Sequence, residues 1–322
     1  MRTIFIGGPG RSGTSFVADR LANHADVSAI RDIELKLFTE KNGLLDLWHS
    51  MVERYSPNRA AVARQQFIRL TDALIEGQFG QPGLKTAAPG EAWRTVFRNF
   101  LNNAHPSGAF ERTNTHLFRQ ASKQLVREVA QLSTSSGLIP RVFLEKTPHA
   151  LLAPDFLAEI APGTGFIHVM RDPRSIAHSL RGMRWGPDDL GDCCAWVSGY
   201  CTAWMDAQKI AAEQGLEIAS FTIEGIAEKP EASADGICRA AGITSQPELF
   251  FGASMSILNG WVNTVAESDL NLLNRRLAGW VHHFGYSIEK IGCQKSVDRA
   301  EISDNCLIPE TASKDGVVEE VL

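Results

Sequence analysis

The sequence lacks the long apolar runs, paired cysteines and excess of basic residues that mark several classes of protein. No segment reaches the roughly 18 uninterrupted apolar residues that a membrane-spanning helix needs, so we expect no membrane anchor. The six cysteines form no C-x-x-C pair, which argues against a disulfide framework or a zinc site and suits a reducing cytosol. Because 32 basic and 37 acidic residues leave a net charge of −5, we expect no nucleic-acid partner.

The apolar residues that are present occur in short runs that alternate with segments of helical period. At 322 residues and 44% apolar content, the chain can form a large core. The first run begins near residue 3, which leaves no room for a signal peptide, so we expect a cytoplasmic protein. This order of elements is typical of an α/β fold with a central parallel sheet. The expected strands cover residues 4–6, 27–30, 141–144, 165–170 and 217–224. The expected helices cover residues 16–23, 151–160, 173–181, 195–211, 232–241 and 271–283, with Pro173 at the first helical position.

A long internal segment and the C-terminus differ from this alternation. From about residue 44 to residue 118 the apolar residues follow a helical period and no strand is evident. We therefore expect a helical insertion over about residues 40–135 that closes over a substrate. Polar residues and an acidic excess predict a disordered tail over residues 293–322, which leaves residues 1–292 as one domain.

The loop of small residues after the first strand is suited to hold an anion. Glycines at positions 7, 8, 10 and 13 let the backbone come close to a ligand. The helix that follows offers unpaired N–H groups and the positive end of its dipole. Arg11 adds a cation, and the hydroxyls of Thr14 and Ser15 add donors. The loop therefore predicts a ligand with a single 5′ phosphate that carries a small anionic group.

Two known patterns overlap in this loop and indicate different ligands. Gly8, Gly10 and Gly13 fit the dinucleotide pattern G-x-G-x-x-G, and acidic residues follow at about the distance of a ribose-binding acid. This leaves open an NAD(P)- or flavin-dependent Rossmann oxidoreductase. Gly8 and Gly13 also fit G-x-x-x-x-G-K-[ST], but Thr14 stands in place of the lysine. Without that lysine ATP hydrolysis is disfavoured, although a P-loop kinase stays open as an alternative.

Residues 10–15 resemble the 5′-phosphosulfate loop of sulfotransferases that use 3′-phosphoadenosine 5′-phosphosulfate (PAPS). The residues that carry this likeness are Gly10, Arg11, Ser12, Gly13, Thr14 and Ser15. Residues 169–179 resemble the family's 3′-phosphate motif, a strand ending in Arg-Asp-Pro with a serine eight positions after the arginine. Residues 143–148 resemble the Glu-Lys-Thr-Pro segment of the carbohydrate and bacterial branches. Three motifs in the family's order are a stronger signal than one glycine loop.

The resemblance implies a three-layer α/β fold of the P-loop NTPase-like sulfotransferase kind and a role for each motif. Arg171 and Ser179 would bind the 3′ phosphate of the donor. Glu34 corresponds to a glutamate that often takes the acceptor's proton, so it is the expected general base. Lys146 would face the sulfuryl group. His149 is a second candidate for the base, because cytosolic relatives use a histidine near an equivalent Lys-Thr.

The resemblance further implies direct in-line transfer of a sulfuryl group from PAPS to an acceptor hydroxyl, with release of 3′-phosphoadenosine 5′-phosphate. Arg11 and Lys146 would hold the sulfuryl oxygens, so we expect no metal. The favoured acceptor is a carbohydrate or a small metabolite, while lipid and tyrosine hydroxyls stay open. A module that binds the nucleotide without turnover also stays open, and the sequence does not indicate an oligomeric state.

Overall fold

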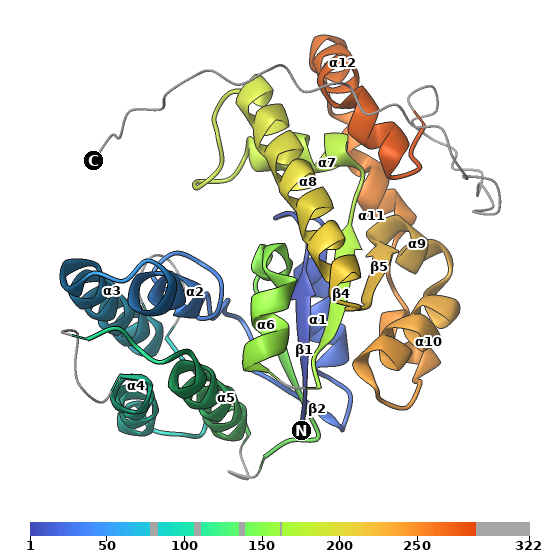
Figure 1. Ribbon diagram of the computed structural model, residues 1–322. Helices are drawn as coiled ribbons and strands as arrows, with labels where there is room; N and C mark the ends of the chain where they lie inside the picture. Colours follow the sequence, from blue (N-terminus) through green and yellow to red (C-terminus); the bar gives the residue numbers. More distant parts are fainter. Residues whose placement is uncertain (78–82, 106–110, 135–138, 162, 288–322) are drawn as a thin grey trace.

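One five-stranded sheet organises the computed structural model, which describes residues 1–77, 83–105, 111–134, 139–161 and 163–287 (Figure 1). The strands are β1 (Arg2–Gly7), β2 (Val27–Ala29), β3 (Val142–Lys146), β4 (Gly165–Met170) and β5 (Ile218–Thr222). All neighbours are parallel, in the order β2-β3-β1-β4-β5. The carboxyl ends of the strands therefore share one edge, where open α/β sheets bind ligands. The tail predicted over residues 293–322 lies outside the described residues.

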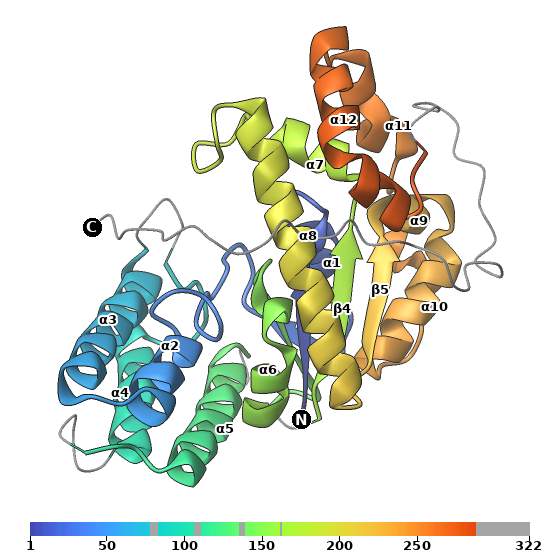
Figure 2. The same ribbon diagram turned by 45° about the horizontal axis from the view of Figure 1, so that its top comes forward.

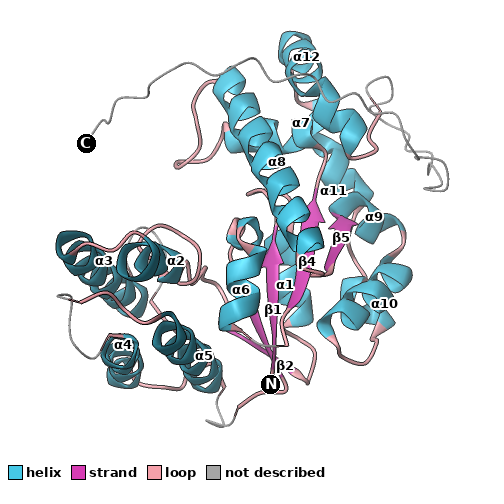
Figure 3. Cartoon of the chain, in the orientation of Figure 1, coloured by secondary structure: helices cyan, strands magenta, loops and turns pink. Residues whose placement is uncertain are grey.

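Helices connect the strands and cover both faces of the sheet (Figure 3). They are α1 (Thr14–Leu21), α2 (Leu44–Trp48), α3 (Pro57–Glu76), α4 (Gly90–Ala104), α5 (Thr115–Leu132), α6 (Pro154–Ile160), α7 (Pro173–Leu180), α8 (Leu190–Glu213), α9 (Ile223–Glu228), α10 (Pro230–Ala241), α11 (Met255–Asn259) and α12 (Glu267–His283). Shorter helical turns cover His49–Glu53, Ala150–Leu152, Pro247–Phe250 and Gly260–Asn263.

Alternate residues along each strand feed two separate cores. Ile4 and Ile6 of β1 pack in a cluster with residues of α1 and α10, whereas Phe5 packs in a second cluster with residues of α6 and α8. Figure 2 shows α6 and α8 on one face of the sheet and α1 on the other. These two cores confirm the expected three-layer α/β fold.

The position of β3 decides against a dinucleotide-binding arrangement. In that fold the second strand pairs directly with the first, so that the ribose-binding acid lies one strand away from the glycine loop. Here β3 lies between β1 and β2. An acid after β2 is therefore about 10 Å, two strand spacings, from β1. The order agrees with the P-loop-like fold that the motifs predict.

Caps explain two of the element boundaries that differ from the sequence-based prediction. The strand expected to end at residue 224 ends at Thr222, whose hydroxyl accepts a hydrogen bond from the Gly225 amide at 3.1 Å and so begins α9. The helix expected from residue 195 begins at Leu190 instead. There the Asp189 side chain accepts a hydrogen bond from the Asp192 amide at 3.1 Å. Both helices start where a side chain satisfies a free backbone N–H group.

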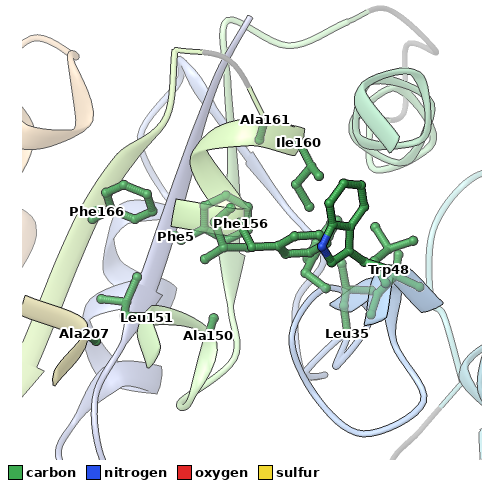
Figure 4. Packing of buried hydrophobic residues seen from close by; sticks show 14 of the residues in the cluster. Phe5, Leu35, Trp48, Ala150, Leu151, Phe156, Ile160, Ala161, Phe166 and Ala207 are labelled. Atoms are coloured by element: carbon green, nitrogen blue, oxygen red, sulfur yellow. The ribbon is translucent and has the colours of Figure 1, made fainter. Parts of the chain in front are cut away.

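The helical insertion lies between β2 and β3 and, in its described residues, contains α2 to α5 and no strand. Figure 4 shows Leu35, Trp48, Phe156 and Phe5 meeting where the insertion packs against α6 and the sheet. The ring centroids of Trp48 and Phe156 are 6.4 Å apart. These contacts fasten the loop between β2 and α2, which carries Glu34, to the core.

The described residues have free thiols, and they form neither a membrane-spanning helix nor a metal-binding group. Their four cysteines, Cys193, Cys194, Cys201 and Cys238, are free and buried. Within the same ranges, no helix combines the length and the apolar character that crossing a membrane requires. No group of three or more His, Cys, Asp or Glu side chains in this part of the chain is placed to hold a metal ion.

Candidate active site

The loop between β1 and α1 packs tightly against a neighbouring strand. A Cβ atom at Gly8 would lie 2.1 Å from the carbonyl oxygen of Val169 in β4. Gly13, with φ of 101°, is the N-cap of α1 in the left-handed region that glycine tolerates. Arg11 also has a positive φ, 72°. A non-glycine residue pays about 1 kcal/mol or more for that conformation, so the surrounding packing must enforce it.

Two hydroxyls of this loop are buried at the N-terminus of α1. Ser12 is fully buried and Thr14 is 4% exposed. In the described structure the Ser12 Oγ has no hydrogen-bond partner. Because an unpaired buried hydroxyl costs free energy, an oxyanion held by the helix N-terminus would satisfy it. The loop therefore fits the phosphate or sulfate that its sequence predicts.

A direct hydrogen bond joins the first motif to the second. The Nε of Arg11 donates to the Oγ of Ser179 in α7 at 3.0 Å. Arg171, which directly follows β4, donates from Nη2 to the Leu258 carbonyl at 2.7 Å, and its buried Nε has no partner in the described structure. Burial lowers the pKa of Arg171, Glu224 raises it, and the nearby charge of Arg11 lowers it further. Ser179, expected to bind the 3′ phosphate together with Arg171, thus also contacts Arg11 of the first motif.

The turn after β4 is fixed by two buried side chains that the sequence-based prediction did not include. Arg174, 2% exposed, donates from Nη2 to the Asp172 carboxylate at 2.7 Å and from Nη1 to Asn274 of α12 at 2.9 Å. Glu224 accepts bonds from the Asp172 amide at 3.1 Å and from the Tyr286 hydroxyl at 2.8 Å. These contacts tie the Arg-Asp-Pro turn to α9, to the middle of α12 and to the segment that follows α12.

The carboxylate of Glu34 lies between two lysines. Lys146, at the end of β3, donates from Nζ to Glu34 Oε1 at 2.9 Å, and the two side chains are 14% and 27% exposed. The Nζ of Lys36 lies 3.8 Å from Glu34 Oε2. In an extended stretch, residues two positions apart face the same side, so Lys36 would face the same side as Glu34. The side agrees, but the backbone is not extended at Lys36, where φ is 52°.

His149 faces a different carboxylate. Its Nδ1 lies 3.8 Å from Glu40 Oε1, and its ring centroid is 5.5 Å from those of Trp196 and Tyr200 in α8. Burial lowers the pKa of His149, and the charge of Glu40 acts in the opposite direction. A neutral imidazole can accept a proton, so His149 stays chemically competent as the second candidate.

A buried acid lies on the opposite side of β3 from Lys146. Glu145 is 2% exposed, and its Oε1 accepts a hydrogen bond from Thr147 Oγ1 at 2.6 Å. Burial raises the pKa of Glu145 to about 7, with the Thr147 hydrogen bond and the Lys146 charge acting in the opposite direction. The same Thr147 oxygen accepts a hydrogen bond from the backbone amide of Lys36 at 3.3 Å.

Comparison with known proteins gives the family. A profile of the sulfotransferase family matches residues 3–247. The chain belongs to the sulfotransferase family. Among solved structures, the sulfotransferase domain from the curacin biosynthetic pathway is similar with a TM-score of 0.51 at 14% identity, over 88% of this chain and 98% of that one. A search of curated proteins finds no match.

Two further solved structures are less similar to this sulfotransferase. The sulfotransferase domain from the Synechococcus PCC 7002 olefin synthase has a TM-score of 0.48 at 14% identity, over 89% of this chain and 95% of that one. Sulfotransferase STF9 from Mycobacterium avium has a TM-score of 0.45 at 12% identity, over 89% of this chain and 78% of that one. The family match and the curacin-pathway domain confirm the predicted family and fold.

A cavity of about 250 Å³ opens beside the Glu34–Lys146 pair of the sulfotransferase. Polar side chains of Ser15, Asp19 and Asp32 line it, and Lys146 forms part of its wall. The remaining lining residues are Ala18, Ala22, Ala29, Ile30, Arg31, Ile33 and Leu144. Asp19 and the cavity were not predicted from the sequence, because the lining joins α1, β3 and an irregular loop.

Proposed function

We propose that this sulfotransferase transfers the sulfuryl group of PAPS to an acceptor hydroxyl in the cytoplasm and releases 3′-phosphoadenosine 5′-phosphate. The observation that carries the proposal is the contact between Arg11 and Ser179. It joins the loop after β1 to the helix after β4, which supports two anion-binding motifs at one edge of the sheet. A donor with a phosphate at each end of its ribose needs two such motifs within one ligand's length.

The donor would be held by backbone amides, hydroxyls and guanidinium groups that can bind anions. The loop residues Gly10, Arg11, Ser12, Gly13, Thr14 and Ser15 would bind the 5′ phosphosulfate with backbone amides, hydroxyls and one guanidinium. Arg171 and Ser179 would bind the 3′ phosphate. The buried, unpaired Nε of Arg171 supports its part, because a phosphate oxygen would satisfy that donor.

The contacts at the end of β3 support the proposed acid–base roles. Glu34 would accept the proton of the acceptor hydroxyl, while Lys146 and Arg11 would stabilise charge on the sulfuryl oxygens during an in-line displacement. Lys146 fixes one oxygen of the Glu34 carboxylate at 2.9 Å, which orients it. His149, beside Glu40, is the alternative base.

The acceptor is proposed to be a small polyhydroxylated molecule, such as a carbohydrate or small metabolite. The cavity beside Lys146 has a volume of about 250 Å³, just below the roughly 300–1,000 Å³ of drug-sized ligand pockets. Its lining includes Ser15, Asp19 and Asp32, which can hydrogen-bond to hydroxyl groups. This space favours a compact hydroxyl-bearing acceptor over a long lipid.

Calorimetry and a radiolabel assay test the proposal. The chain should bind 3′-phosphoadenosine 5′-phosphate more tightly than ADP or NAD, and sulfate from labelled PAPS should appear on a member of a pool of sugars and metabolites. Equal affinity for the three nucleotides would contradict the donor assignment. Tight binding without transfer to any acceptor would indicate a nucleotide-binding module, and magnesium-dependent ATP turnover would indicate a kinase.

A further inference from the structure

The loop that carries Glu34 and Lys36 has no regular secondary structure between β2 and α2. Ile33, Leu35 and Leu37 occupy alternate positions and are at most 8% exposed, so they fasten one side of the loop to the core. The charged side chains of Glu34 and Lys36 contact each other on the other side. Burial of alternate side chains determines that the charged side chains point away from the core. It does not determine the backbone conformation at Lys36.

That conformation needs a restraint of its own. Lys36 has φ of 52°, in the left-handed region that a lysine rarely adopts. Its amide donates to Thr147 Oγ1 at 3.3 Å, and the Thr147 hydroxyl donates to Glu145 Oε1 at 2.6 Å. Glu145 and Thr147 are only 2% and 3% exposed, so solvent does not compete at this point.

We propose that Glu145 and Thr147 are positioning residues for sulfuryl transfer. They hold the backbone of Lys36, and with it the carboxylate of Glu34, at the distance from Lys146 that the reaction needs. The inference rests on the proposed function, because it assumes that Glu34 and Lys146 act on the substrates.

The direction of the two hydrogen bonds explains why an acid is needed beside the threonine. A threonine hydroxyl has one hydrogen, so it can donate only once and must accept its other bond. The Glu145 carboxylate accepts that hydrogen, which turns the oxygen lone pairs of Thr147 toward the Lys36 amide. Without the acid the hydroxyl could rotate, and it would no longer be a defined acceptor.

The consecutive residues Glu145, Lys146 and Thr147 contact the loop that carries Glu34 and Lys36 at two points. Because successive residues of a strand face opposite sides, the side chain of Lys146 points away from that of Glu145. Lys146 therefore reaches the Glu34 side chain directly, while Thr147, fixed by Glu145, reaches the Lys36 backbone. Residues 145–147 therefore provide the lysine that pairs with the proposed base and also hold the backbone of the loop that carries this base.

Thr147→Val and Thr147→Ser form the matched pair that tests this role. Valine keeps the shape and removes the hydroxyl, whereas serine keeps the hydroxyl. The measurements are the hydrogen-exchange rate of the Lys36 amide by NMR, the affinity for 3′-phosphoadenosine 5′-phosphate by calorimetry, and the rate of sulfate transfer at saturating PAPS.

We expect the valine variant to exchange the Lys36 amide about three- to tenfold faster, which is the effect of one lost hydrogen bond. Its transfer rate should fall about ten- to a hundredfold, as for a misplaced catalytic group, with nucleotide affinity unchanged. The serine variant should recover both values to within about threefold of wild type. An unchanged Lys36 exchange rate in the valine variant, or a serine variant as impaired as valine, would overturn the proposal.

A second pair of variants keeps the test decisive if Thr147→Val does not fold. The amide oxygen of Glu145→Gln can still accept the Thr147 hydroxyl, whereas Glu145→Met cannot, so only the methionine variant should show faster Lys36 exchange. Failure of the proposed function is seen separately. If the wild-type chain neither binds the nucleotide nor transfers sulfate, the donor assignment fails, while the exchange rates still show whether Thr147 holds the loop.

Discussion

Replacing Glu145 by glutamine should remove a large pH dependence from the stability of the protein. Burial raises the pKa of Glu145 to about 7, against an ordinary value of 4.5. A raised pKa means that the folded chain keeps a proton that the unfolded chain has lost. The contribution of protonated Glu145 to the free energy of unfolding is complete below about pH 4.5 and is lost as the pH rises through about 7. At about 1.4 kcal/mol for each tenfold change, wild type should lose about 3 kcal/mol from this group over that range.

The assay is urea denaturation of wild type and Glu145→Gln at several pH values between about 4.5 and 8. The pH dependence matters more than the absolute difference, because the new amide N–H₂ would replace an oxygen that has no partner in the described structure. Glu213→Gln, an exposed carboxylate on α8, serves as the control and should follow wild type. If the curves of wild type and Glu145→Gln run parallel to within about 0.5 kcal/mol, the buried acid does not titrate as argued.

Three further substitutions test the proposed site and its support. Glu34→Gln should lower sulfate transfer by about a hundredfold or more with nucleotide affinity unchanged, and full activity in a radiolabel assay would remove Glu34 as the base. Arg171→Ala should weaken calorimetric binding of 3′-phosphoadenosine 5′-phosphate by about tenfold or more, yet leave adenosine 5′-phosphate nearly unaffected; an equal loss for both would refute its role at the 3′ phosphate. Arg174→Met leaves the Asp172 carboxylate buried without its partner, so it should lower the free energy of unfolding by about 3 kcal/mol in urea denaturation. A decrease below about 1 kcal/mol would show that the fold does not need this ion pair.

The fold could be predicted from sequence because its central strands are short apolar runs followed by recognisable turns. Strands buried on both faces read as continuous apolar segments, and β1 and β4 have this form. Pro173 marked the start of α7 as expected, since its missing N–H is tolerated at the first helical position. The start of α8 was misplaced and α9 was not predicted, because their caps, Asp189 and Thr222, lie among residues that also suit a loop or a strand.

The nearness of Lys146 to Glu34 follows from the carboxyl ends of parallel strands sharing one edge. The supporting contacts could not be predicted in this way. Arg174 meets Asn274 a hundred positions further along, and Glu224 meets Tyr286, so no local pattern relates the partners. The buried state of Glu145 likewise depends on which elements cover that face of β3.

The hydrogen bond between Arg11 and Ser179 also means that the Arg11 side chain loses part of its conformational freedom during folding and not during nucleotide binding. It engages one of the five N–H groups of the guanidinium and holds the side chain in place before any nucleotide arrives. Immobilising a long side chain on binding costs about 0.5–1.5 kcal/mol in conformational entropy, and here part of that loss has already occurred in the folded chain. Ser179→Ala would then weaken donor recognition in two ways, through the loss of this preordering of Arg11 and through the loss of the hydroxyl proposed to bind the 3′ phosphate.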